Sequence, residues 1–144
     1  MTAPVAVTAR SQRWLRAIAY GLLAELATIV TIVVIVMVHR YVLAKGLGDE
    51  YYAAFGERVG GIVGIIGGTF YTFLFAQALM RRLSANFVAH GILLAIVAVA
   101  LSVGGSIAGH HGVPTGYLIA SALKLAAGAF AGFQAAKSPA QATA

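Results

Sequence analysis

The sequence lacks cysteine and is poor in charged residues. Without cysteine, the chain has no disulfide, no thiolate nucleophile and no cysteine-ligated zinc or iron–sulfur site. Only 10% of its 144 residues are charged, whereas a soluble domain carries about 25%. In contrast, 60% of the residues are hydrophobic and the mean hydropathy is +0.89. We therefore expect a single integral membrane domain over residues 1–144, with the lipid bilayer as its main partner.

The basic excess does not indicate a nucleic-acid partner. The net charge is +6 and the pI is about 10.1. A nucleic-acid-binding domain gathers its basic residues on one face or along one helix. Here the ten Lys and Arg residues are spread along the chain, and most of them flank apolar segments. We expect no nucleic acid among the partners.

Four apolar stretches are long enough to cross a bilayer as helices, which takes about 20 residues each. Lipid cannot satisfy exposed backbone groups, and no stretch shows the alternation typical of a membrane barrel strand. The sequence therefore predicts an all-α fold, a four-helix transmembrane bundle built from two antiparallel helical hairpins. The predicted spans are residues 17–38, 59–80, 87–108 and 115–136.

The distribution of Lys and Arg predicts the orientation of the spans. The first span is too long for the apolar region of a signal peptide, about 7–15 residues, so we expect it to be retained as an anchor. Basic residues favour the side that holds the N-terminus, which indicates that both termini are cytoplasmic, as in a multi-pass protein of a bacterial inner membrane. The compared residues are Arg10, Arg13, Arg16, Arg81, Arg82 and Lys137 on that side, against Arg40, Lys45 and Arg58 on the other.

The connections between the spans differ in length. Segment 81–86 is short, which predicts that the second and third helices pack as a tight antiparallel hairpin. Segment 39–58 is longer. Within it, Asp49 can cap a helix, Gly56 can end one, and three aromatic residues between them suit the headgroup zone. We predict a short interfacial helix in this first external loop, with an external lid or binding loop as the alternative.

Small residues recur at every fourth position in the second and fourth spans. At this spacing they lie on one helix face, where another helix can approach closely. The rows predict helix packing, either within the chain or in a homodimer seam, and a sliding contact in a transporter is the functional alternative. The candidate packing residues are Gly60, Gly64, Gly68, Gly128 and Gly132.

Two ionisable residues lie deep in the predicted spans. Glu25 is about 12 Å from the cytoplasmic end of the first span, at about 1.5 Å per residue, and Lys124 lies near the middle of the fourth. A charge at such a depth costs at least about 2.5 kcal/mol, so each residue needs a partner or water. The two can reach one another, although their side chains lean in opposite directions along antiparallel helices.

This pair supports two interpretations. A paired Glu25 fixes the arrangement of the helices as a structural ion pair with Lys124. An unpaired Glu25 is a carboxylate that can bind and release a proton or a substrate, and intramembrane ionisable residues are often functional. A dry pair in a closed bundle favours the first interpretation, whereas a wet cavity of substrate size favours the second.

Gln77 and His90 form a second polar candidate. They lie at similar depth on either side of the 81–86 connection, so they are candidates for a hydrogen-bonded interfacial pair or for a polar relay to Glu25.

Other chemistry-bearing residues do not form a site by spacing. His110 and His111 are adjacent, but no third ligand is placed near them, so we expect no metal and no cofactor. Ser106 lies close to His110 without the G-x-S-x-G elbow, and HExxH and P-loop motifs are absent. We expect the protein not to be an enzyme.

The stretch LLAELATIV, from Leu22 to Val30, resembles the first-helix motif of small multidrug resistance transporters. These are four-helix proteins that work as dimers and use a membrane-embedded Glu, preceded by Ala, for both proton and cationic substrate. The resemblance implies that role for Ala24 and Glu25. The family's Trp-containing signature between its second and third helices is absent, and the sole tryptophan, Trp14, lies before the spans. The resemblance therefore serves as a chemical analogy.

These observations predict a non-enzymatic four-span membrane protein, an accessory or scaffold subunit held together by its helix faces and by Glu25 and Lys124. The alternative is a small proton-coupled transporter that acts as a homodimer, with Glu25 as the embedded carboxylate. A homodimer or a larger membrane complex is the expected assembly in either case.

Overall fold

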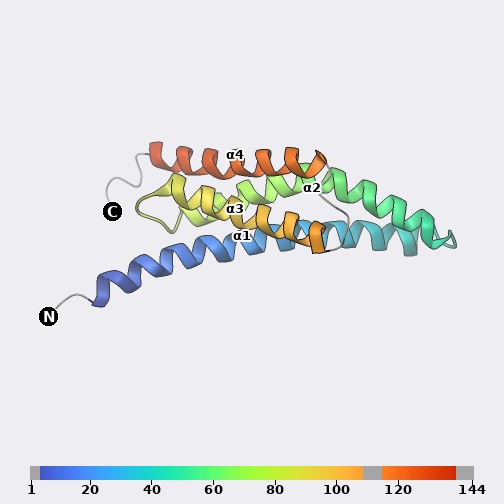
Figure 1. Ribbon diagram of the computed structural model, residues 1–144, viewed down its shortest axis with the longest axis horizontal. Helices are drawn as coiled ribbons and strands as arrows, with labels where there is room; N and C mark the ends of the chain where they lie inside the picture. The colour runs from blue at the N-terminus through green and yellow to red at the C-terminus, as the bar shows by residue number, and fades with distance from the viewer. Residues whose placement is uncertain (1–3, 109–114, 139–144) are drawn as a thin grey trace.

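The computed structural model describes residues 4–108 and 115–138, and these residues form an all-helical fold (Figure 1). Within them there is no β-strand, and four helices are long and apolar enough to cross a membrane. The prediction of an all-α protein with four such helices is confirmed. The helices are α1 (Pro4–Val38), α2 (Asp49–Met80), α3 (Phe87–Ala108) and α4 (Thr115–Lys137).

Two of the helices extend well beyond the apolar stretches. α1 begins at Pro4 and α2 begins at Asp49, so both include polar turns that precede the predicted spans. The separate interfacial helix predicted in the first loop is therefore wrong, because residues 49–58 are the first turns of α2. Gly56 does not end a helix there. Gln, Glu and Arg have good helix propensity, so a helix can begin several turns before its apolar run.

A π-helix, η1 (His39–Leu43), extends the C-terminal end of α1. Its wider turn is closed by the amide of Ala44, which donates to the carbonyl of His39 at 2.8 Å. Gly46 follows with a φ of 82°, a left-handed conformation that glycine adopts without steric cost. The chain thus reverses direction between α1 and α2 within a few residues.

The order of the helices around the bundle differs from their order in the chain. α1 packs beside α2 and α3, and α4 packs beside α3 and α2. The two diagonals of this square are α1–α4 and α2–α3, so α2 and α3 have few contacts although they are consecutive. The predicted tight hairpin of the second and third helices is therefore wrong.

The connection between α2 and α3 is long enough to cross the bundle end. Six extended residues reach about 20 Å, whereas the diagonal of a square of helices 8–10 Å apart is about 13 Å. The segment ends at Asn86, whose φ is 57°. Asn is one of the few residues other than glycine that is enriched in this left-handed region.

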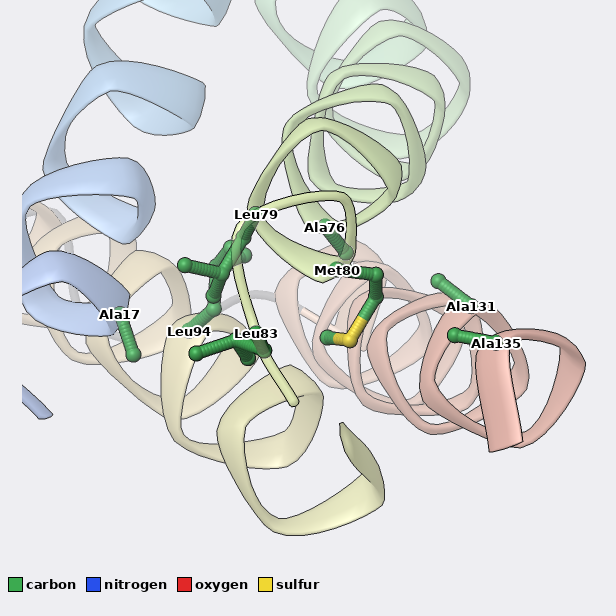
Figure 2. Close-up of a cluster of buried hydrophobic side chains, with 8 residues drawn as sticks. All are labelled: Ala17, Ala76, Leu79, Met80, Leu83, Leu94, Ala131 and Ala135. Atoms are coloured by element: carbon green, nitrogen blue, oxygen red, sulfur yellow. The ribbon is translucent and has the colours of Figure 1, made fainter. Parts of the chain in front are cut away.

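A cluster of buried apolar side chains closes the bundle near this connection (Figure 2). Leu79 points towards Ala17 of α1 and Leu94 of α3, whereas Met80 points towards α4. Because alanine contributes half of the cluster, the helices approach closely. Its members are Ala17, Ala76, Leu79, Met80, Leu83, Leu94, Ala131 and Ala135.

Glycines mark the closest approaches between the helices. A Cβ added at Gly132 would lie 2.6 Å from the Cα of Val88, and one added at Gly21 would lie 2.6 Å from the carbonyl oxygen of Leu94. Gly91 and Gly128 face one another, so a Cβ on either would clash with the backbone of the other. α3 is thus packed closely against both α1 and α4.

Gly60 and Gly64 do not take part in this packing. A Cβ added at either would meet no atom within 4 Å. The prediction that these two glycines pack within the chain is wrong. The reason is visible in Figure 1, where the N-terminal part of α2 continues past the ends of α3 and α4, together with the C-terminal part of α1.

Candidate buried ion-pair site

Three polar side chains from three helices meet inside the bundle. Lys124 of α4 donates from Nζ to Oε2 of Glu25 in α1 at 2.5 Å and to Oγ of Ser102 in α3 at 2.6 Å. Ser102 Oγ in turn donates to Oε1 of Glu25 at 2.7 Å. Glu25 is 6% exposed and Lys124 is 2% exposed. The three groups therefore form a closed ring of hydrogen bonds away from the surface, which we call the buried polar ring.

α2 covers the buried polar ring with a glycine. A Cβ added at Gly68 would lie 2.7 Å from Cε of Lys124 and 3.7 Å from Cγ2 of Thr28. The absence of a side chain at position 68 is what gives the lysine stem its space. All four helices therefore contribute to the site, three with polar groups and α2 with a cavity for the lysine.

The ion pair joins the two helices on one diagonal of the bundle. α1 and α4 are separated by α2 and α3, so their backbones are not close neighbours. Glu and Lys have long side chains, and these reach one another across the centre. Their opposite leans along antiparallel helices do not prevent the contact, because α1 is displaced along the bundle so that Glu25 lies level with Ser102 and Lys124.

Neighbouring hydroxyl groups do not compete for the ring. Thr28 donates to the carbonyl of Ala24 at 3.0 Å, and Thr72 donates to the carbonyl of Gly68 at 2.7 Å. Both are bonds to the preceding turn of their own helix, which is the usual way for a threonine in a membrane helix to satisfy its hydroxyl. The carboxylate of Glu25 thus has Lys124 and Ser102 as its partners among the described residues.

In this arrangement the two opposite charges cancel, and both charged groups have hydrogen-bond partners. Two opposite charges in contact are strongly attracted in a medium of low dielectric constant, and the attraction offsets the cost of removing both from water only where further hydrogen bonds are present. Ser102 supplies those bonds. A carboxylate held in this way is not free to exchange its ammonium partner for a substrate unless the bundle opens.

Two hollows on the described part of the molecule lie away from this ring. One of about 470 Å³ is at the tip of the α1–α2 extension, and one of about 300 Å³ lies between α1 and α2, next to the hydrogen bond that joins Thr31 and Tyr71 at 2.9 Å. Neither is lined by a member of the buried polar ring.

Gln77 and His90 are not brought together. Gln77 donates to Oε1 of Gln134 in α4 at 2.7 Å. His90 bonds through Nδ1 to the carbonyl of Asn86 at 2.8 Å, and its ring stacks on Trp14 with 4.2 Å between centroids. The predicted pair is wrong because α2 and α3 lie on a diagonal, so Gln77 meets its neighbour α4 instead.

His90 does not reach Glu25 through a chain of hydrogen bonds. Its Nε2 is buried and has no hydrogen-bond partner among the described residues. The predicted relay therefore has no continuous path in this conformation.

No group of three potential metal ligands occurs within residues 4–108 and 115–138. The adjacent His110 and His111 lie outside the described residues.

The chain has no match among family models, curated proteins or solved structures.

Sequence reasoning missed two members of the site. Ser102 is a small polar residue in an otherwise apolar run, and it recurs four residues later as Ser106, which is also buried. Two polar residues four positions apart lie on one helix face, and this pattern could have indicated that the face points into the bundle. Gly68 was identified only as a helix-packing residue. Its contact with Lys124 depends on how far two helices are displaced along one another, and the spacing of residues in the sequence does not give that displacement.

Proposed function

We propose that this chain is a non-enzymatic, four-span integral membrane protein, an accessory or scaffold subunit whose Glu25–Lys124 pair holds the bundle in one arrangement. The observation that carries the proposal is the closed ring that the pair forms with Ser102, buried among four helices. A transporting carboxylate needs an accessible space, and neither of the two hollows described above is lined by Glu25.

The orientation of the bundle follows from the same physical arguments. We place the start of α1 and the end of α4 in the cytoplasm, because the basic residues concentrate at that end. The tip formed by η1 and the first turns of α2 then lies at the opposite surface. Substituted-cysteine labelling from each side of the membrane tests this placement in the naturally cysteine-free chain.

Paired substitutions test the structural role of the ion pair. Glu25→Gln and Lys124→Met each leave one buried group without its partner, and breaking a buried pair in this way costs about 3–5 kcal/mol. The double variant removes both charges and recovers much of that loss. The free energy of unfolding in bicelles or mild detergent measures each effect. The matched control is Asp49→Asn, which breaks the exposed pair with Arg40 and costs about 1 kcal/mol or less.

The alternative function gives the opposite result. If Glu25 acts as the proton-binding carboxylate of a transporter, Glu25→Gln keeps the stability of the wild type and abolishes proton-coupled uptake. Equal stability of wild type and Glu25→Gln overturns the structural proposal.

The assembly is tested by gentle extraction followed by native mass spectrometry. A second type of subunit in fixed ratio supports the accessory role. A homodimer with no other subunit instead favours the transporter, since the transporters that Leu22–Val30 resembles work as dimers.

A further inference from the structure

The hollow at the tip of the α1–α2 extension combines positive charge with aromatic rings. Its lining consists of Arg40, Tyr41, Lys45, Gly46, Leu47 and Tyr52, and its volume is about 470 Å³. No acidic residue belongs to this lining. The hollow is therefore a basic pocket, and we call it the tip pocket.

The floor of the tip pocket is held in place by specific contacts. The hydroxyl of Tyr52 donates to the carbonyl of Ala44 at 2.5 Å and accepts from the amide of Leu47 at 3.2 Å. The guanidinium of Arg40 lies 4.8 Å from the ring centre of Tyr52, and one of its nitrogens bonds to Asp49 at 2.8 Å. The position of Arg40 is thus fixed before any ligand arrives, which lowers the entropic cost of binding.

The charges of the tip pocket leave one cation without a counterion. Asp49 partly neutralises Arg40, and Arg40 has no second ion pair with a described residue. Lys45 is exposed and has neither a hydrogen bond nor an ion pair within the described part of the chain. The pocket therefore matches a ligand with one negative charge, and Arg presents a fork of donors that suits a phosphate.

We place the tip pocket near the edge of the hydrocarbon layer, from the sequence of α1 and η1. The exposed apolar run of α1 finishes at Val38, and Arg40 follows in η1, a type of helix turn that is frequent at functional sites. Around the pocket, three apolar side chains remain largely exposed: Val42 at 64%, Leu43 at 72% and Leu47 at 46%. Exposed apolar side chains beside a basic pocket favour a ligand that has both an anionic head and an acyl chain.

We propose that the tip pocket binds the phosphate of an anionic lipid headgroup, with Arg40 and Lys45 as its charged ligands. Tyr41 supplies an aromatic wall at headgroup level, where tyrosine is enriched. The apolar side chains of Val42 and Leu43 then lie against the lipid's acyl chains. This site is separate from the buried polar ring and does not depend on the role assigned to Glu25.

The experiment is native mass spectrometry of the full chain released from micelles that contain equal amounts of phosphatidylglycerol and phosphatidylcholine. Both lipids carry a phosphate, but only phosphatidylglycerol has a net charge. The variant is Lys45→Gln, because Lys45 is exposed and has no hydrogen bond or ion pair within the described part of the chain. The matched control is Arg58→Gln, which removes the same charge from an exposed residue outside the pocket.

The wild type is expected to retain phosphatidylglycerol in preference to phosphatidylcholine. Lys45→Gln should weaken that retention about five-fold, the usual contribution of one basic residue near an anionic surface, and Arg58→Gln should leave it within about two-fold of wild type. Equal retention of the two lipids overturns the proposal, and so does an equal loss in both variants.

A competition arm distinguishes a lipid from a soluble phosphate. Glycerol 3-phosphate is added at millimolar concentration to the same samples. Retention of phosphatidylglycerol despite the competitor supports the lipid ligand. Its displacement shows that the pocket recognises a free phosphate ester, and the lipid assignment is then wrong.

Discussion

Glu25 and Lys124 are separated by 99 residues in the chain, and their side-chain atoms lie 2.5 Å apart across the centre of the bundle. They join α1 to α4, the two helices on one diagonal, while the neighbouring pairs are packed through alanine and glycine. Small-residue contacts permit close approach but leave helices able to slide. The ion pair and Ser102 select one relative displacement of the helices.

Gly68→Ala is expected to destabilise the bundle, because its new Cβ would lie 2.7 Å from Cε of Lys124. We expect a loss of about 1–3 kcal/mol in the free energy of unfolding, the usual cost of overpacking. The control is Gly64→Ala, one turn earlier on the same helix, where a Cβ meets nothing within 4 Å. That variant should match the wild type or exceed it slightly. Equal effects of the two variants contradict the placement of Lys124 beneath Gly68.

Ser102→Ala removes the hydroxyl that closes the buried polar ring. The expected cost is about 0.6 kcal/mol and at most about 1.7 kcal/mol, the average and the maximum measured for hydrogen bonds between membrane helices. Ser121→Ala is the comparison, because Ser121 bonds to the carbonyl of Tyr117 in its own helix at 2.6 Å. In bicelles, the free energy of unfolding of Ser102→Ala should be lower than that of Ser121→Ala by most of that cost. A Ser102→Ala protein as stable as Ser121→Ala shows that the hydroxyl contributes nothing to the ring.

The order of helices around the bundle can be read by cross-linking. The chain has no cysteine, so introduced pairs react without background. Cysteines at positions 77 and 134 should be joined rapidly by a short bifunctional thiol reagent, since Gln77 and Gln134 bond at 2.7 Å. Cysteines at positions 77 and 90 should react much more slowly, because α2 and α3 lie on a diagonal. The reverse order of rates supports a tight α2–α3 hairpin and contradicts the structure.

The number and kind of helices could be predicted from the sequence for a simple physical reason. Apolar length sets how many helices can cross a bilayer, and charge marks where they leave it. The predictions of the fold that proved wrong in the segments between the spans were those drawn from loop length and from helix-end residues. A short connection between α2 and α3 indicated a hairpin, but the same six residues also reach across a diagonal. Asp49 and Gly56 indicated a separate helix, but polar residues of good helix propensity continue α2 without a break.

The site was predictable in part. Glu25 and Lys124 were identified because a charge inside an apolar helix requires a partner. Their contact depends on how far α1 is displaced along the bundle, and the approach of Gly21 to the backbone of Leu94, which accompanies that displacement, is given by no local pattern. The partner of Gln77 could not be predicted locally either. Gln134 is its partner because of the order of the helices around the bundle, and the depth of Gln77 along its helix does not reveal this.

The diagonal ion pair also has a consequence for how the protein is made. α1, which carries Glu25, is synthesised before α4, which carries Lys124. At about 5–20 residues per second, the 99 residues that follow Glu25 up to and including Lys124 take about 5–20 s to appear. During that interval, the carboxyl group of Glu25 lacks its Lys124 partner. A nascent chain interrupted before α4 retains this unmatched acid, so an unfinished product differs from the complete bundle by one carboxyl group without its ion-pair partner.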